Sequence, residues 1–598
     1  MKSSRRILVA LLILCTVGLI GLIHLYSDQS PQALAFKRYV KYSVTQMFSG
    51  ELGNETEGLD KNHSTEIYVD GTEVAPNELN LYKDVKKVYR DSNITRLVNY
   101  ADGYQLDFPS GTSFDFSRSS CVVEAYGDGY EYTVSFEYCP YAEMTDEMGD
   151  GLASLVPWFS AENATEQYIG YYQSRFMLNE AWQNNNNVTV SQAEPFQAGS
   201  FRGIAFHATM EGVPDEKYDG YSYLYITLDG QDFLRIMVKY QKENSQFPSQ
   251  AIALLSGFRS FARIGNPSLS TDYYPEISCN WNSETESLYR KIQASDELSW
   301  GIFTEDIYGK GIDETIPALE DKLEYRFETI LAYVHYIHAF PTEFMEQTWN
   351  EGRIVELTYQ LTTNNNTDFY SESPMLNIYR GEGLDQVREF ARAAKEFGHP
   401  FLFRLCNEMN SDWTSYGGVV NMADPDIFVD TWRTIYEIFQ EEGVDNCIWI
   451  YNPNDRNAPP NKWNDSLNYY PGNEYVHMIG VTGYNNGTYY TQWSEEWREF
   501  DTIYNEIQNL YQQPYGAFPW IITEFSSSSV GGDKVAWIEN MFAHIKDYPN
   551  IKIAVWFSLA DWDSEGNVAR PYWLDETPET TEAFRIGLKD YPQRNWLN

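Results

Sequence analysis

Two glutamates follow short apolar runs, and their residue type and placement suit acid/base and nucleophilic chemistry. Glu408 comes after "PFLFRLCN" (400–407), and Glu524 comes after "PWIIT" (519–523). Retaining hydrolysis of a glycosidic bond uses two carboxyl groups about 5–5.5 Å apart, one as nucleophile and one as acid and then base. The environments of the two groups must keep one ionised and one protonated near neutral pH. An isolated glutamate in so acidic a chain is usually an ordinary strand-end acid, so a fold must bring both to one cleft.

The region from about 293 onward supplies such a fold, because short apolar strands alternate there with amphipathic helices. Eight strands in about 306 residues predict a (β/α)8 barrel, whose catalytic residues lie at the carboxyl ends of the strands. Glu408 and Glu524 end the predicted fourth and seventh strands. The eight predicted strands are LSWGIF (298–303), FETILAYVHY (327–336), RIVELTYQ (353–360), PFLFRLCNE (400–408), CIWIYNPN (447–454), VHMIGVTGY (476–484), PWIITEF (519–525) and IKIAVWFSL (551–559).

Three ordered segments of this region resemble glycoside hydrolase family 26. "FRLCNEMNSDW" (403–413) is similar to the acid/base segment of that family, roughly F-R-P-x-H-E-M-N-G-x-W. "YYPGNEYVHMIGVTGY" (469–484) resembles its Y-x-P-G-D-x-Y-V-D-x-x-G-x-D-x-Y segment, and "WIITEFSS" (520–527) resembles its nucleophile segment. The resemblance covers about 293–598. It implies a β-mannanase-like (β/α)8 barrel with the acid/base on strand four and the nucleophile on strand seven.

The resemblance also implies roles for seven residues. Glu408 would be the acid/base, Glu524 the nucleophile, and Tyr484 a hydrogen-bond donor that holds the nucleophile. The remaining expectations are that Trp413 borders the cleft, Trp556 floors a sugar subsite, Arg404 orients carboxylates from below, and Asn407 binds substrate. For Trp556 and Arg404 the alternatives are barrel packing and a buried ion pair.

Several positions depart from the pattern of the family's mannanases. Asn407 stands where they have His, although Asn-Glu is the usual pair of the wider clan, in which the Asn amide binds the 2-hydroxyl. The other departures are Tyr359-Gln360 for Trp-His on strand three, Thr414-Ser415-Tyr416-Gly417 for a Trp-rich stretch, and His477 and Thr482 for Asp. The catalytic residues are therefore kept while the mannose-reading residues are not. The expected substrate is a β-mannan, a β-glucan, a xylan or a mixed exopolysaccharide.

The N-terminal residues predict a membrane anchor. A short basic segment, 1–6, precedes an uncharged run that extends to Tyr26. Twenty helical residues span about 30 Å, the thickness of the hydrocarbon core. We expect a cytoplasmic tail over 1–6, a transmembrane helix over 7–26 and an extracellular catalytic domain. The alternative is a cleaved signal peptide and secretion, with Ala33-Leu34-Ala35 as the cleavage site.

Three further regions are expected between the anchor and the barrel. Residues 27–64 are polar and predict a stalk, and residues 266–292 contain Pro and Ser and predict a linker. Residues 65–265 predict an α+β domain with alternating strands such as "YSYLYITL" (221–228), and they resemble the PsbP/Mog1-type fold, which implies no activity. No pair of acids in a plausible cleft was found in 65–265, so bond cleavage is not expected to need that domain.

Composition limits the function class. The formal net charge of −43 argues against nucleic-acid binding, because phosphate contacts need Lys and Arg. The sequence contains no CxxC pair, Walker loop or zinc-binding helix, so we expect neither metal nor cofactor. The 46 Tyr and 17 Trp fit sugar stacking as well as ordinary core packing.

Two function classes remain. The first is a retaining, endo-acting glycoside hydrolase on a β-linked polysaccharide. The second is a catalytically inactive barrel that binds surface carbohydrate or serves exopolysaccharide assembly. The presence of Glu408, Glu524 and Tyr484 together favours the enzyme.

Overall fold

A computed structural model gives the arrangement of the chain. It describes residues 68–69, 72–73, 86–90, 94–99, 104–109, 112–115, 122–126, 132–139, 175–198, 201–227, 233–241, 258–260, 273–363, 367–493, 495–593 and 596–597. The predicted tail (1–6), anchor (7–26) and stalk (27–64) lie outside these residues. Within the ranges just given, no helix combines the length and apolar character needed to span a bilayer.

The described residues fall into two compact units. One unit holds those from Tyr68 to Cys139 and from Asn187 to Ser260. The other holds Arg175–Asn186 together with everything from Tyr273 onward.

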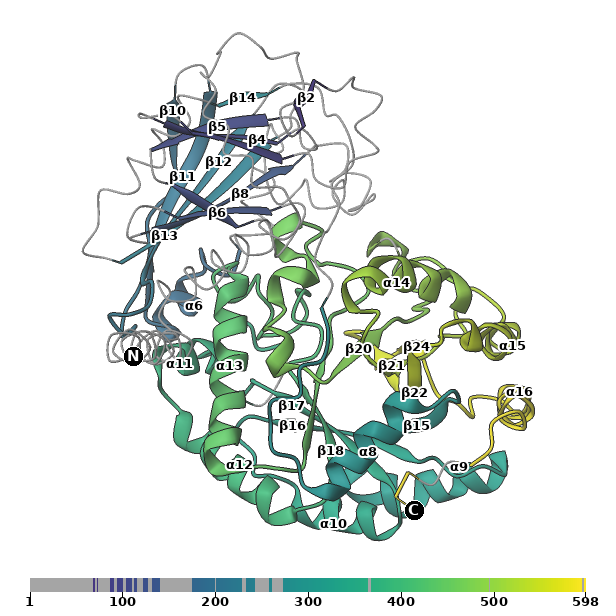
Figure 1. The fold of residues 1–598 in the computed structure, drawn as a ribbon. Helices are drawn as coiled ribbons and strands as arrows, with labels where there is room; N and C mark the ends of the chain where they lie inside the picture. Colours follow the sequence, from purple (N-terminus) through teal and green to yellow (C-terminus); the bar gives the residue numbers. More distant parts are fainter. Residues whose placement is uncertain are drawn as a thin grey trace, which may run out of the picture. The chain divides into compact units, whose positions relative to one another are not determined.

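The second unit is a closed barrel of eight parallel strands (Figure 1). The strands are β15 (Ser299–Thr304), β16 (Thr329–His335), β17 (Ile354–Gln360), β18 (Phe401–Leu405), β19 (Cys447–Tyr451), β20 (Met478–Thr482), β21 (Trp520–Phe525) and β22 (Ile551–Ser558). Each strand pairs with the next in the chain, and β15 pairs with β22 from Ser299↔Ile553 to Thr304↔Ser558. All eight predicted strands are therefore confirmed, with their ends moved by a few residues.

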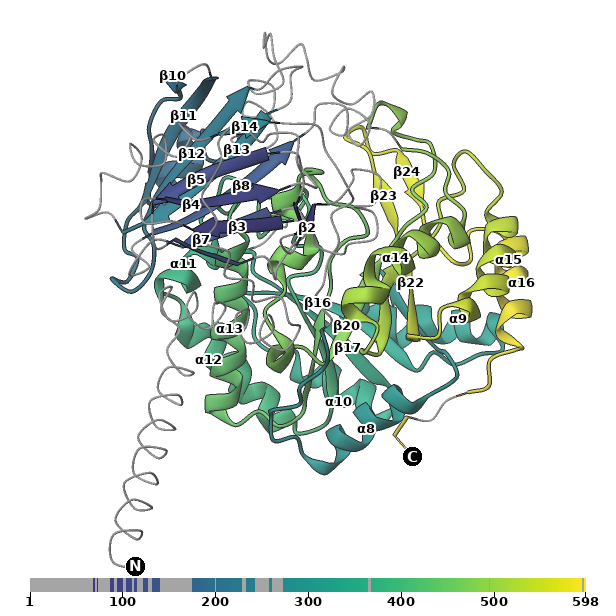
Figure 2. The same cartoon turned by 45° about the horizontal axis from the view of Figure 1, so that its top comes forward.

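Helices surround the barrel, and α14, α15 and α16 lie outside β20–β22 (Figure 2). Their bounds are α8 (Ser283–Ala294), α9 (Ile316–Leu323), α10 (Thr342–Asn350), α11 (Pro374–Arg380), α12 (Leu384–Phe397), α13 (Pro425–Glu442), α14 (Phe500–Tyr515), α15 (Lys534–His544) and α16 (Pro578–Leu588). Helix α12 shows why such segments pack here. Val387, Phe390, Ala391 and Ala394 recur at helical spacing and are buried on one face, while Gly398 ends the helix with a φ of +72°.

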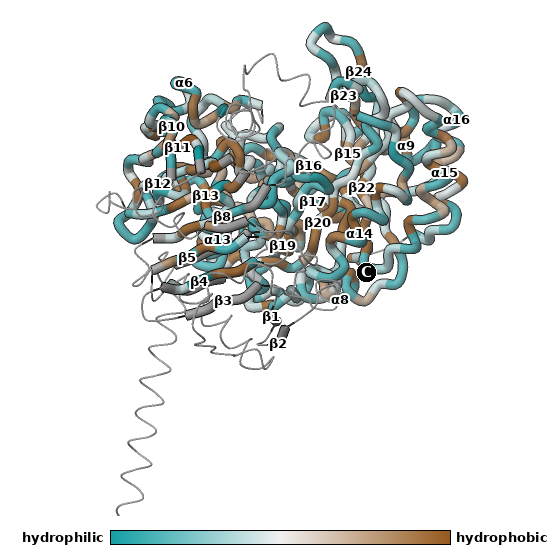
Figure 3. Tube along the Cα trace, turned by 90° about the horizontal axis from the view of Figure 1, so that it is seen from above, coloured by the Kyte–Doolittle hydropathy of each residue, from teal (hydrophilic) through white to brown (hydrophobic). Residues whose placement is uncertain are grey.

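The barrel interior is filled by side chains from the strands and from α8. Figure 3 shows hydrophobic residues along the central strands, around β20. One buried cluster joins Leu288, Tyr289 and Ile292 of α8 to Leu331, Leu402, Ile448, Ile521 and Ile553 of the strands. The predicted linker over 266–292 therefore needs correction, because its last residues form a helix that packs into the barrel core, and this unit begins before 293.

The described part of the first unit is antiparallel β structure. One sheet has the order β10-β11-β12-β13-β8-β7-β6 with β9 on β11, and a second has the order β14-β5-β4-β3. The strands are β3 (Lys86–Arg90), β4 (Ile94–Asn99), β5 (Tyr104–Pro109), β6 (Ser113–Asp115), β7 (Val122–Tyr126), β8 (Tyr132–Cys139), β9 (Val188–Val190), β10 (Glu194–Ala198), β11 (Phe201–Met210), β12 (Gly220–Thr227), β13 (Phe233–Tyr240) and β14 (Arg259–Ser260), and a separate pair joins β1 (Tyr68–Val69) to β2 (Thr72–Glu73). The β part of the predicted α+β domain is present. The one helix described between 65 and 265, α6 (Glu180–Asn185), belongs to the barrel unit.

Candidate active site

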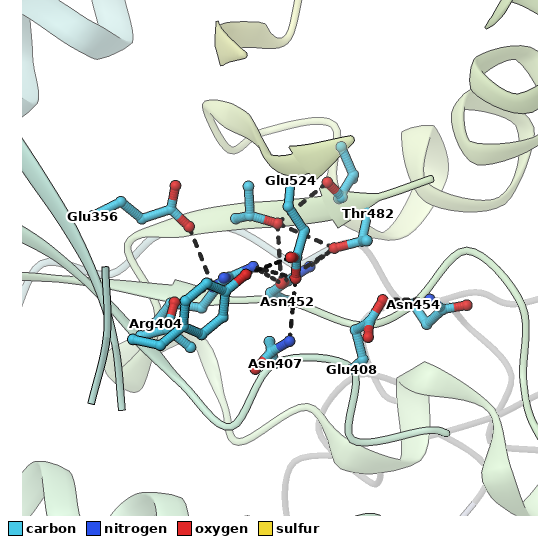
Figure 4. Close-up of polar contacts among 12 residues, drawn as sticks. Glu356, Arg404, Asn407, Glu408, Asn452, Asn454, Thr482 and Glu524 are labelled. Atoms are coloured by element: carbon cyan, nitrogen blue, oxygen red, sulfur yellow. Dashed lines mark hydrogen bonds and ion pairs between the residues drawn. The ribbon is translucent and has the colours of Figure 1, made fainter. Parts of the chain in front are cut away.

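Glu524 lies in β21 at the centre of a set of hydrogen-bond donors (Figure 4). Its Oε1 accepts from Arg404 Nη1 at 3.0 Å and from Asn407 Nδ2 at 3.2 Å. Its Oε2 accepts from the phenols of Tyr333 and Tyr484, the latter at 3.2 Å. Four donors from β16, β18 and the segments after β18 and β20 thus fix the orientation of both oxygens, as a nucleophile requires.

Glu408 lies beyond the end of β18 rather than on the strand. The strand stops at Leu405, and the chain then turns through left-handed conformations, with φ +49° at Cys406 and +56° at Glu408. Such φ values are uncommon for residues other than glycine and tend to occur at functional sites. Two bonds from Ser411 to the Glu408 carbonyl, from N at 3.1 Å and from Oγ at 2.6 Å, stabilise the turn.

The Glu408 side chain has its own pair of donors. Its Oε2 accepts from Trp413 Nε1 at 2.9 Å, and its Oε1 accepts from Asn454 Nδ2 at 2.6 Å. Burial, together with the negative charge of Glu524, raises the pKa of Glu408 to about 7, although both hydrogen bonds act in the opposite direction. Glu408 therefore holds a proton that it can give up near neutral pH. Figure 4 shows the two glutamates in one site.

Arg404 of β18 has no exposed surface and lies between two acids (Figure 4). Its guanidinium is 3.0 Å from Glu524 Oε1 and 3.2 Å from Oε1 of Glu356, a residue of β17 that is also fully buried. It also donates to Thr358 Oγ1 at 2.7 Å and Asn452 Oδ1 at 3.0 Å. Burial raises the pKa of Glu356 to about 8, against the effect of Arg404. With a pKa of about 8, Glu356 favours its protonated form at neutral pH, which leaves the charge of Arg404 to the Glu524 carboxylate.

Three departures from the mannanase pattern form one hydrogen-bonded group. Asn407 Oδ1 accepts from Gln360 Nε2 at 3.1 Å and from Tyr416 OH at 2.8 Å. Because both donors face the carbonyl oxygen of the amide, the Asn407 amino group is directed at Glu524. Gln360 and Tyr416 thus orient Asn407 beside the carboxylate.

The other two departures have local structural partners. His477 has no exposed surface, and its Nδ1 accepts from Trp449 N at 2.9 Å, while burial lowers its pKa to about 3. Thr482 Oγ1 accepts from Asn452 Nδ2 at 3.1 Å, and Asn452 also contacts Arg404.

Trp556 does not floor a sugar subsite, and that expectation is corrected. The side chain is fully buried, its Nε1 donates to Tyr572 O at 3.1 Å, and its ring lies 5.1 Å from Phe584 of α16. Since successive strand residues point to opposite faces, Trp556 faces the helices and Phe557 faces the interior. Phe557 packs against the barrel core and lies 5.9 Å from Tyr484.

Tyr333 and Asn454 are site residues that sequence reasoning missed. Each contacts one of the two glutamates. A signal existed, because each belongs to the carboxyl-terminal part of a predicted strand, 327–336 or 447–454, where barrel active sites gather. The sequence would have yielded both residues only if every polar residue at the eight strand ends had been considered as a candidate.

Two exposed tryptophans, Trp413 and Trp562, follow the carboxyl ends of barrel strands, where the two glutamates lie. Trp413 is 42% exposed and contacts Glu408, as a ring bordering a cleft would. Trp562, at the end of β23 (Ala560–Trp562), is 58% exposed and lies 6.4 Å from Trp573. The described part of the chain contains no group of three or more His, Cys, Asp or Glu side chains placed to hold a metal ion.

Comparison with known proteins gives matches to the barrel region. Residues 348–527 match the profile of glycosyl hydrolase family 26. Endoglucanase H of Acetivibrio thermocellus is 27% identical over 270 residues, which are 43% of this chain and 27% of that protein. Mannan endo-1,4-β-mannosidase of Bacillus subtilis is 28% identical over 106 residues, which are 17% of this chain and 28% of that protein. The match thus spans little more than a quarter of either curated relative. The solved catalytic domain of an endo-β-1,4-mannanase of family 26 from Bacillus sp. JAMB-750 has 16% identity and a TM-score of 0.40, covering 53% of this chain and 93% of that one.

Proposed function

The barrel of this chain is a glycosyl hydrolase family 26 domain, and we propose that it cleaves a β-linked polysaccharide internally, with retention of the anomeric configuration. The observation that carries the proposal is that two carboxyl groups in one site have different environments. Glu524 is surrounded by four donors, whereas burial and the charge of Glu524 raise the pKa of Glu408 to about 7. Such a pair suits double displacement.

In the proposed reaction, Glu524 attacks the anomeric carbon and forms a glycosyl-enzyme while Glu408 protonates the departing oxygen. Glu408 then takes a proton from water, which attacks the same carbon and releases Glu524. The amide of Asn407, held by Gln360 and Tyr416, is placed to bind the 2-hydroxyl of the sugar beside Glu524. Tyr484 and Tyr333 keep the nucleophile aligned in both steps.

We propose β-mannan and β-glucan as the first substrates to test. The names of the two curated relatives support both, since one is an endoglucanase and the other a mannan endo-1,4-β-mannosidase. The replacement of His by Asn407 and of Trp-His by Tyr359-Gln360 supports including xylan and mixed exopolysaccharides.

A reducing-end assay on mannan, mixed-linkage glucan, cellulose and xylan tests the proposal. The wild-type chain is expected to release oligosaccharides from at least one polymer, and Glu524→Gln and Glu408→Gln are each expected to lose at least about 10³-fold in kcat/KM. Glu389→Gln on α12, an exposed change of the same chemistry, is the matched control. A folded wild-type protein that binds these polymers without cleaving any would instead support the inactive, carbohydrate-binding barrel.

We also propose that the barrel works outside the cell, tethered through residues 7–26. The uncharged run after Lys2, Arg5 and Arg6 supports an anchor with its N-terminus inside. Protease added to intact cells should then remove the barrel, and the full chain should remain with washed membranes. Release of a chain shortened at its N-terminus into the medium would favour a cleaved signal peptide.

A further inference from the structure

Residues Arg175–Asn186, here called the strap, belong to the same compact unit as the barrel. The strap contains α6, which lies beside α11 (Figure 1). Met177 and Trp182 have no exposed surface. The ring of Phe176 lies 5.3 Å from that of Phe369, so the strap packs against the segment between β17 and α11.

The C-terminal end of the strap is fixed to the start and end of α11. The Asn186 side chain accepts from Ser373 N at 2.8 Å and donates to Ser371 O at 3.1 Å. Arg380 donates to the main-chain carbonyl of Asn186. These bonds hold the strap on the segment that follows β17.

The N-terminal end of the strap reaches residues 406–413, the loop after β18 that carries Glu408. Arg175 Nη2 lies 3.0 Å from Asp412 Oδ2, and each side chain is 23% exposed. Asp412 precedes Trp413, whose indole donates to Glu408 at 2.9 Å although its ring is 42% exposed. Residues 406–411 of this loop are buried, whereas Asp412 and Trp413 are partly exposed, so the pair with Arg175 acts on the end of the loop that carries the indole.

We infer that Arg175 is a positioning residue of the catalytic site: by pairing with Asp412, the strap holds the loop that presents Trp413 to Glu408. The inference rests on the proposed role of Glu408 as acid/base. It differs from the expectation that bond cleavage does not need 65–265, and the test below decides between them. The contact joins residues 237 positions apart, which no local pattern reveals.

The ionisation of Glu408 reports on this loop, because the Trp413 hydrogen bond lowers the Glu408 pKa and its loss must raise it. Since the proposed acid must be protonated to act, kcat/KM falls as pH rises through the Glu408 pKa, which gives the alkaline limb of the pH–rate profile. Loss of the Trp413 hydrogen bond then shifts this limb to higher pH. The groups that face Glu408 are Glu524 of β21, Arg404 of β18, Tyr416, Tyr484, Tyr572, Trp413 and Asn454.

The test compares Arg175→Ala and Asp412→Asn in the full chain, alone and with Trp413→Phe. A positioning role predicts that both single variants lower kcat/KM by about 3- to 10-fold and move the alkaline limb upward. If the substitutions acted only through their charge, the two variants would shift the limb in opposite directions. Removing the Arg175 cation raises the Glu408 pKa, whereas removing the Asp412 anion lowers it. In the Trp413→Phe background neither change should add a further shift. Arg290→Ala, which breaks an exposed pair with Glu286, is the control.

Hydrogen exchange provides a readout that does not need turnover. Peptides covering 406–413 should exchange faster in Arg175→Ala and Asp412→Asn than in the wild type or Arg290→Ala. Unchanged exchange, or opposite shifts of the alkaline limb in the two variants, would overturn the inference. If the wild type cleaves no polymer, the proposed function fails, and the exchange result alone decides whether the strap holds the loop.

Discussion

Tyr333 of β16 and Tyr484, two residues after β20, donate hydrogen bonds to the same atom, Oε2 of Glu524. Burial, and next the charge of Glu524, raise the pKa of both phenols well above the usual value, so both remain donors across the neutral range. Glu524, the proposed nucleophile, thus accepts from two phenols on different strands, and the family resemblance did not suggest Tyr333.

Replacing either tyrosine with phenylalanine is expected to reduce turnover. Tyr333→Phe and Tyr484→Phe should each lower kcat/KM by about 10- to 100-fold, because a hydrogen bond to a charged group contributes roughly 1.5–3 kcal/mol. Tyr336→Phe is the matched control, since its hydroxyl donates to Gly383 O at 2.8 Å instead. Wild-type kinetics in Tyr333→Phe would mean that its bond to Glu524 is not functional.

The stereochemistry of the product tests the division of roles between the glutamates. Early product examined by NMR should keep the β configuration. With an activated aryl glycoside and azide, Glu408→Ala should yield a β-glycosyl azide, because the glycosyl-enzyme forms and azide attacks it without base help. Glu524→Ala with azide should yield the α-azide. An initial α-anomer from the wild type would indicate inversion, and exchanged azide products would mean that the two roles are reversed.

The eight strands were predictable because each is a short apolar run set off by amphipathic helices, a pattern that depends only on neighbouring residues. It was harder to predict which side chains of each strand face the barrel interior. An offset of one residue exchanges interior and exterior, which is why Trp556 was expected in the cleft and lies against α16.

The site was predictable in part for the same reason. Glu408 lies just after β18 and Glu524 lies near the carboxyl end of β21, so the barrel itself brings them together. The left-handed turn at Cys406 and Glu408, and the contacts of Arg175 and α8 with the barrel, depend on residues distant in sequence. No local periodicity encodes such contacts.

The pH dependence of activity should follow Glu408. With a pKa raised to about 7, Glu408 loses its proton above that pH, and kcat/KM should fall there. Asn454→Ala removes a hydrogen bond that lowers this pKa, so the alkaline limb should move to higher pH. Asn457→Ala, in the same loop but bonded to Asn410, should leave the limb in place. A downward shift in Asn454→Ala would contradict the assignment of the limb to Glu408.

The packing of α8 into the barrel predicts a large loss of stability from a small change. Ile292→Ala should lower the free energy of unfolding of the barrel by about 2–5 kcal/mol, since the side chain is fully buried in the interior cluster. Glu286→Ala, on the exposed side of the same helix, should change it by less than about 0.5 kcal/mol. Denaturant unfolding of both variants measures this. A stability equal to that of wild type in Ile292→Ala would mean that α8 does not close the core.

Glu356 should make the stability of the barrel depend on pH. Burial raises the pKa of Glu356 from 4.5 to about 8, so between these values the folded state holds a proton that the unfolded state releases. The resulting stabilisation is fully present below about pH 4.5 and is lost as pH rises to about 8, a change on the order of 3 kcal/mol between pH 5 and 8. Gln cannot titrate and has nearly the same shape, so Glu356→Gln should remove this slope and unfold at higher denaturant than wild type at pH 8.

The contact with Arg404 does not reverse the sign of this pH dependence, because burial is the larger effect on the Glu356 pKa. Unfolding midpoints at pH 5, 6.5 and 8, with Glu389→Gln as the exposed control, give the comparison. Parallel pH slopes in wild type and Glu356→Gln would mean that folding does not raise the pKa of Glu356 and that the ion pair with Arg404 offsets its burial.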